Sequence, residues 1–135
     1  MYLTILVAPA DLVNLEFRPG LFLANEEYSG FDIGAFIRFK ILSTKIYIIA
    51  GFNNHSNRSS GHNNGGSYSK DILYKGIGVG FQKDSKLSFD LIYYWTNDKD
   101  YAFSRVSDFL GNTRNINKQI NGILKASFSL AWDIF

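Results

Sequence analysis

Residues 122–135, GILKASFSLAWDIF, alternate apolar and polar or small side chains along their whole length. The apolar set is Leu124, Ala126, Phe128, Leu130, Trp132 and Ile134. The intervening set is Lys125, Ser127, Ser129, Ala131 and Asp133. A period of two residues is typical of a β-strand whose two faces lie in different surroundings. The segment is also longer than the roughly five or six residues usual for strands of water-soluble proteins.

The same alternation recurs in earlier segments of the chain. These segments are 13–23, 31–41, 46–53, 73–81 and 87–95. They have 8–11 residues each, close to the roughly 9–11 residues of tilted strands that cross the hydrocarbon core of a bilayer. Pro19 interrupts the first of them and should lie at a sheet edge, a bulge or a strand end, because it has no N–H to donate.

The first ten residues, MYLTILVAPA, have two interpretations. We favour a short strand over residues 2–7 followed by a Pro-Ala-Asp turn at residues 9–11. The alternative is the remnant of a truncated signal peptide, because the segment is apolar and ends in Ala8-Pro9-Ala10.

One face of the alternating segments is almost wholly apolar, whereas the other carries glycine, serine, charges and aromatic residues such as Phe36 and Tyr94. A solvated outer face would not combine these types, so the second face is expected to form a crowded interior. The charged residues expected inside are Glu16, Arg18, Asp32, Arg38, Lys40, Asp90 and Lys125. Both signs are present, which favours a ladder of paired charges over an ion path.

The connections differ in length, and aromatic residues lie near the segment ends. Residues 42–44 and 82–85 form short connections, residues 26–30 an intermediate one, and residues 53–70 and 97–119 long ones. Short turns at one end and long loops at the other are typical of membrane barrels. The aromatic residues predict two interfacial girdles. Phe31, Phe52, Tyr93 and Trp95 would form the outer girdle, and Phe39, Phe81 and Trp132 the inner one.

Composition excludes several classes of protein. The formal net charge is +2, from 14 basic and 12 acidic residues, and the basic residues form no stripe that would bind nucleic acid. Cysteine is absent, which excludes disulfide scaffolds and thiol chemistry. No apolar run approaches the roughly 18–20 residues of a membrane helix. The 135 residues predict one domain, 1–135.

Strand number is the difficulty, because bacterial single-chain barrels have an even number of strands, about eight or more. Six segments, or seven with residues 2–7, are too few. Further strands could lie within residues 101–117, or an oligomer could complete the sheet. We favour a third explanation, in which the chain is the C-terminal part of a longer barrel and its N-terminus is incomplete.

The long connection 53–70, NNHSNRSSGHNNGGSYSK, contains both histidines, His55 and His62. A plain external loop is the main expectation. In the catalytic alternative, His55 acts as base to Ser56 and Asp71 orients the imidazole. Adjacent strand residues point to opposite faces, so His55 and Ser56 could meet only in a loop or at a bulge. A two-histidine metal site is a further alternative, although no carboxylate lies at ligand spacing.

From Leu12 onward, these patterns and the terminal Phe135 resemble the Gram-negative outer-membrane β-barrel proteins. The resemblance implies an antiparallel up-and-down transmembrane β-barrel in the cell outer membrane. Its partners would be outer-membrane lipid and the barrel assembly machinery. The Asn54-His55-Ser56-Asn57 segment, followed by Asn64-Gly65, is similar to the His-x-Ser-Asn motif of outer-membrane lipid A deacylases and phospholipases. In this chain the histidine directly precedes the serine.

The expected function is a structural, adhesive or small-pore role without enzymatic chemistry, cofactor or metal. The first alternative is a lipid A deacylase-like esterase that uses His55, Ser56 and Asp71 at the outer rim. The second is a water-soluble β-barrel that binds a small apolar ligand.

Overall fold

The computed structural model describes residues 2–58, 65–84 and 87–130. These residues form ten β-strands. Their bounds are β1 Ile5–Ala10, β2 Val13–Asn25, β3 Tyr28–Lys40, β4 Ile46–Asn57, β5 Gly65–Ser67, β6 Lys70–Gln82, β7 Leu87–Trp95, β8 Asp100–Ser107, β9 Thr113–Gln119 and β10 Ile123–Leu130. Within the described ranges, no helix has the length and apolar character needed to cross a membrane.

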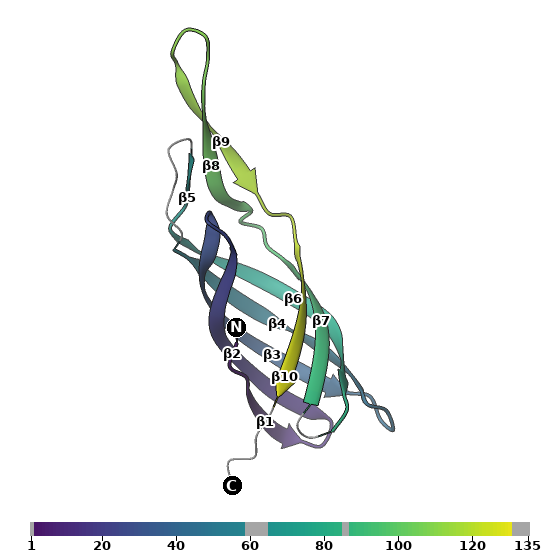
Figure 1. The fold of residues 1–135 in the computed structure, drawn as a ribbon. Coiled ribbons are helices and arrows are strands. Elements are labelled where there is room, and N and C mark those ends of the chain that lie inside the picture. Colours follow the sequence, from purple (N-terminus) through teal and green to yellow (C-terminus); the bar gives the residue numbers. More distant parts are fainter. Residues whose placement is uncertain (1, 59–64, 85–86, 131–135) are drawn as a thin grey trace.

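Seven strands form one antiparallel sheet in the order β1-β2-β3-β4-β6-β7-β10. The sheet is curled, and its strands lie obliquely side by side (Figure 1). Its concave face is the polar one, since Arg18 of β2 reaches the buried Asp90 of β7 across it. The all-β antiparallel prediction is therefore confirmed. The described strands do not close into a barrel, because β1 and β10 remain the two edges of the sheet.

All six main predicted segments are strands of this sheet; segment 87–95 coincides with β7, and the other strands begin or end at different residues than predicted. The strand predicted over residues 2–7 begins and ends too early, since β1 extends to Ala10, contains Pro9 and is followed by a turn at residues 11–12. The ladder explains this shift: Val7 pairs with Leu15, and Ala10 pairs with Val13. Residues 131–135, with Trp132 and Phe135, lie outside the described residues.

Pro19 lies on β2 beyond the last β1 ladder pair, Ile5 with Phe17. Its carbonyl accepts a hydrogen bond of 2.9 Å from the amide of Leu3. Pro19 thus lies beyond the β1 ladder, next to the isolated bridge between Tyr2 and Gly20, where its missing N–H interrupts no pair of that ladder.

The two predicted long connections contain additional strand structure. Residues 53–57 continue β4, and Asn57 pairs with Lys70 at the start of β6, so the prediction of a loop beginning at residue 53 was wrong. Asn53, His55 and Asn57 face the interior, and the alternate residues Asn54 and Ser56 are polar as well, so the composition of this segment resembled a loop. Strands β5, β8 and β9 form a separate three-stranded sheet. The β8–β9 hairpin extends away from the main sheet (Figure 1), so strands within residues 101–117 do not widen that sheet.

Inward-facing glycines make room for aromatic rings from neighbouring strands. A Cβ atom on Gly80 would lie 2.1 Å from Cζ of Tyr47, and one on Gly76 would lie 2.8 Å from Cε1 of Tyr94. Tyr47 and Tyr94 are both buried. The alternation of glycine and aromatic residues on this face therefore reflects rings packed directly on the backbone of the sheet.

Candidate functional site

The first interior cluster consists of four charged side chains. Arg18 contacts Glu16 at 2.6 Å through Nε and Asp90 at 2.5 Å through Nη2. Arg38 donates to Glu16 through Nε, and its Nη2 lies 2.9 Å from Oε1 of Glu16. Two arginines and two carboxylates thus satisfy one another, and all four are at most 4% exposed. This balance matters because an unpaired buried charge is strongly destabilising.

These four residues come from strands that are not neighbours in the sheet. Glu16 and Arg18 lie on β2, Arg38 on β3, and Asp90 on β7. Strands β4 and β6 separate β3 from β7 in the ladder order. The Arg18–Asp90 pair therefore crosses the concave interior of the curled sheet. The ring of Tyr47 lies beside this pair, with its hydroxyl 3.3 Å from Asp90 and its face 4.5 Å from the Arg38 guanidinium.

A second interior cluster surrounds Asp32 of β3. Its carboxylate accepts from Nζ of Lys125 at 2.8 Å and from the hydroxyl of Tyr2 at 2.5 Å. Nδ1 of His55 lies 2.6 Å from its other oxygen. Lys125 comes from β10, so this contact joins an edge strand to the middle of the sheet. The two clusters share the interior with buried hydrophobic residues, among them Phe36, Ile49 and Tyr94.

The predicted inward charges are confirmed for Glu16, Arg18, Asp32, Arg38, Asp90 and Lys125, and Lys40 is half-buried at the end of β3. Sequence reasoning missed Tyr2 and His55 as members of the interior. His55 could have been found by extending the period-two pattern of β4, since it is in phase with the buried Tyr47 and Asn53.

The residues of the catalytic alternative are placed on two faces of the sheet. His55 is 1% exposed and faces the interior, where its ring lies 4.3 Å from that of Tyr28. Ser56 faces outward and donates a hydrogen bond of 2.6 Å to Asp71. The structure therefore brings Ser56 and Asp71 together but turns His55 toward Asp32. Regular β4 geometry is the reason, because no bulge interrupts its pairing with β3 or β6 in this region.

His62, the second histidine of the metal alternative, lies outside the described residues. Among the residues that the structure describes, no group of three or more histidine, aspartate or glutamate side chains could hold a metal ion.

Polar contacts join the second sheet to the main sheet. The Asn57 side-chain amide lies 3.0 Å from the carbonyl of Tyr68 and 3.3 Å from that of Tyr101. Lys118 of β9 contacts Glu27, in the β2–β3 turn, at 2.6 Å. The base of the β8–β9 hairpin is therefore attached to the main sheet.

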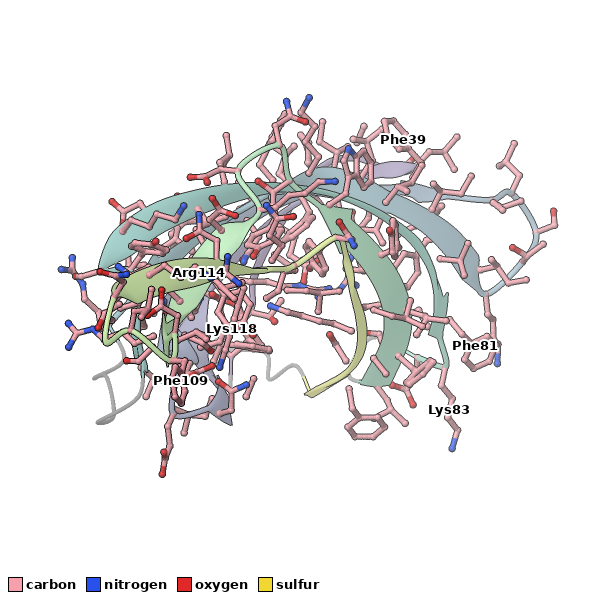
Figure 2. All side chains as sticks on the ribbon, turned by 90° about the horizontal axis from the view of Figure 1, so that it is seen from above. Phe39, Phe81, Lys83, Phe109, Arg114 and Lys118 are labelled. Carbon is pink, nitrogen blue, oxygen red and sulfur yellow. The ribbon has the colours of Figure 1, made fainter. Side chains whose placement is uncertain are left out.

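The outer face has the opposite character to the interior. Along β6, Ile77 is 52% exposed and Val79 is 56% exposed, whereas the intervening inward positions are glycines. Figure 2 shows Phe39 and Phe81 on the outer, convex side of the curled sheet. The exposed apolar side chains on the main strands include Leu15, Phe17, Ile33, Ile37, Phe39, Ile48, Phe52, Leu73, Phe81, Phe89, Leu91, Tyr93, Leu124 and Phe128.

Aromatic residues lie toward both ends of this outer face. Phe81 pairs with Phe89, which pairs with Phe128, near the turns that follow β3 and β6. Toward the other end, Phe52 and Trp95 each pair with Lys75, and the rings of Tyr93 and Trp95 stack. The outward positions predicted for Phe31, Phe39, Phe52, Phe81 and Tyr93 are confirmed by their exposure.

No family model matches this chain, and neither a curated protein nor a solved structure matches it. The main structural feature of the chain is a curled sheet with paired charges on the concave side and apolar side chains on the convex side.

Proposed function

We propose that this chain forms the main part of an outer-membrane β-barrel with a structural and adhesive role and no enzymatic chemistry. The observation that carries the proposal is the reversed distribution of polarity, in which Asp32 and Asp90 are 0% exposed while Phe52 and Phe81 are 53% and 47% exposed. Water-soluble monomers rarely expose contiguous apolar patches above a few hundred Å². In a bilayer, the same surface would contact hydrocarbon, and its exposure would cost little free energy.

The length of the apolar surface supports this placement. On β6 it extends from Leu73 to Phe81, which is about 27 Å of extended chain at roughly 3.4 Å per residue. At a tilt of about 40°, this corresponds to roughly 20 Å along the membrane normal, near the ~25 Å band of membrane barrels. Apart from Lys75, the outward positions in this stretch are apolar, and beyond Leu73 the outward residues Asp71 and Ser56 are polar.

Strand direction supports an eight-stranded closure. Both edge strands run toward the end with the short turns: β1 leads into the turn at residues 11–12, and β10 ends with Leu130 opposite Leu87. Direct pairing of β1 with β10 would therefore be parallel. One further strand between them, antiparallel to both, would give eight, the smallest usual number for bacterial barrels. We propose that a longer form of this chain supplies that strand.

The edges themselves support the same closure. Leu6 pairs with the inward-facing Glu16, yet it is 42% exposed. A second copy inserted the same way up would also present β10 parallel to β1. It could not provide the antiparallel neighbour that an up-and-down barrel requires.

The closure can be tested with paired cysteines at the two edges, β1 and β10, of the longer form of the chain after its insertion into a membrane. An intervening strand would hold the backbones of β1 and β10 roughly 10 Å apart, too far for a disulfide, which needs Cα atoms within about 7 Å. We therefore expect no disulfide between Leu6→Cys and any of Lys125→Cys, Ala126→Cys or Ser127→Cys in non-reducing electrophoresis. As a positive control, Val7→Cys with Leu15→Cys, a registered pair of adjacent strands, should crosslink. Efficient β1–β10 crosslinking would refute the intervening strand.

Within the proposed barrel, the interior supports a structural role over a pore. The Arg18–Asp90 and Lys125–Asp32 pairs cross it; Arg18, Asp90 and Asp32 are buried, and Lys125 is half-buried. Small barrels commonly fill their interiors with side chains in this way. The esterase alternative is not favoured, because Ser56 and His55 face opposite sides of β4. The water-soluble alternative would require the apolar face to be concave.

The β8–β9 hairpin supports the adhesive part of the proposal. At its tip, Phe109 is 105% exposed and Leu110 is 83% exposed. Asp108 fixes the turn by accepting hydrogen bonds from the backbone amides of Leu110 and Asn112. The side chain of Asn112 also donates to Asp108 and lowers the pKa of this carboxyl group. Gly111 adopts a φ of +82°, which glycine tolerates readily. An ordered turn thus displays two apolar side chains to solvent.

We expect Phe109→Ser combined with Leu110→Ser to reduce adherence of cells that display the protein to uncoated polystyrene by several-fold. The matched control is Leu42→Ser, which also removes an exposed apolar side chain (71% exposed) but lies in the β3–β4 turn at the opposite end of the sheet. Adherent cells should be counted for variants that are present on the cell surface at equal levels. Unchanged adherence of the double variant, or an equal loss for Leu42→Ser, would refute the adhesive role of the hairpin.

A further inference from the structure

An apolar groove of about 750 Å³ crosses the outer face from β1 to β7. The floor of the groove is formed by the small side chains of Ala35 and Ala50 and by the backbone at Gly51 and Gly76. Larger apolar side chains form its sides, among them Ile5, Phe17, Ile37, Phe52, Ile77 and Trp95. Its volume lies in the range of roughly 300–1,000 Å³ found for ligand pockets.

One charged side chain lines this groove from the outer face of the sheet. Lys75 of β6 is exposed and lies in register with Phe52 on one side and Trp95 on the other. From Leu73 to Phe81 it is the one charged residue among the outward positions of β6. Among the described residues its amine has no ion-pair partner.

The position of Lys75 indicates what it could bind. An outward lysine costs about 2–4 kcal/mol at the bilayer midplane but about 0–1 near the interfaces. Lys75 is closer to the polar outward residue Asp71 than to the short-turn end of β6, and its flexible stem can carry the ammonium toward the headgroups. An ammonium at this depth is complementary to the phosphate of a lipid headgroup. The apolar groove directly beside it is complementary to that lipid's acyl chain.

We propose that this groove is a binding site for an anionic bilayer lipid, with an acyl chain against Ala35 and Ala50 and the headgroup phosphate on the Lys75 ammonium. The proposal rests on the proposed membrane location and adds a lipid class to it. Charge complementarity distinguishes this occupant from a second protein copy, because the groove itself provides a cation.

Trp95 allows the site to be tested directly, because it lines the groove and is one of two tryptophans in the chain. In a Trp132→Phe background, Trp95 fluorescence would be measured after insertion into phosphatidylcholine vesicles with a minor lipid that carries brominated chains. We expect brominated phosphatidylglycerol to quench Trp95 fluorescence as if its concentration beside the groove were about fivefold higher than that of brominated phosphatidylcholine. One contact between a lysine and an anionic lipid would give an enrichment of this size.

The variants separate charge from groove shape. Lys75→Gln should abolish the phosphatidylglycerol preference and Lys75→Arg should keep it, whereas Ala50→Phe should weaken it by filling the groove. Lys83→Gln, which removes an exposed lysine beyond the short-turn end of β6, is the matched control and should leave the preference unchanged.

Two outcomes would overturn the site, and they are distinguishable. Equal quenching by the two brominated lipids, or an unchanged preference in Lys75→Gln, would refute the lipid site while leaving the membrane location intact. Absence of quenching by either lipid in folded protein would refute the membrane location and the site together.

Discussion

Replacing Asp90 with asparagine should lower the free energy of unfolding by about 3–5 kcal/mol, the usual cost of breaking a buried ion pair from one side. Asp90 is 0% exposed and contacts Arg18 at 2.5 Å. Arg38 approaches it at 3.7 Å, and Tyr47 lies within hydrogen-bond distance. Asparagine keeps the shape of the side chain but leaves two buried arginines with a single carboxylate, that of Glu16.

The effect can be measured by urea unfolding of the protein in detergent micelles, followed by tryptophan fluorescence. Asp11→Asn is the matched control, because Asp11 is exposed in the β1–β2 turn and should change stability by no more than about 0.5 kcal/mol. Adding Arg18→Met to Asp90→Asn restores neutrality to the cluster and should recover part of the loss. Equal stability of Asp90→Asn and Asp11→Asn would show that the interior charges are not an essential part of the fold.

Much of this fold could be predicted because one physical signal, alternation with a period of two, extends over whole strands. It located the six main strands and assigned Arg18, Asp32 and Asp90 to the inner face. The prediction succeeded because the pleat of a β-strand fixes which face each side chain occupies.

The same signal failed where both faces of a strand are polar. Residues 53–57 contain asparagine, histidine and serine, so they resembled a loop, although they pair with β3 and β6. Placing His55 and Ser56 in a loop allowed a catalytic pair that regular strand geometry separates. Composition could not reveal that the inner face of this sheet remains polar up to the end of β4.

Long-range organisation was also beyond the sequence pattern. Nothing in residues 100–119 distinguishes strands that join the main sheet from a hairpin that leaves it. That difference depends on pairing partners, since β8 pairs with β5 and β9 and not with β7. The open edges at β1 and β10 follow from strand order, which the periodicity does not encode.

Ile77→Arg should be the most damaging outward substitution if the convex face contacts lipid. Ile77 is 52% exposed and lies midway between Leu73 and Phe81 along the apolar face of β6. At the bilayer midplane, an outward arginine costs about 2–4 kcal/mol, and near the interfaces the cost falls to about 0–1. In water the same substitution at an exposed site would have little effect on stability and would improve solubility.

The membrane orientation of this sheet is tested most directly by measuring folding with and without phosphatidylcholine vesicles. The proteins compared are the wild type, Ile77→Arg, Leu73→Arg and Phe81→Arg. Protease protection and far-ultraviolet circular dichroism would report the folded fraction. The proposed barrel predicts vesicle-dependent folding that is impaired most by Ile77→Arg and much less by the two substitutions nearer the ends. Monodisperse, folded protein in lipid-free buffer, with Ile77→Arg as stable as the wild type, would contradict it.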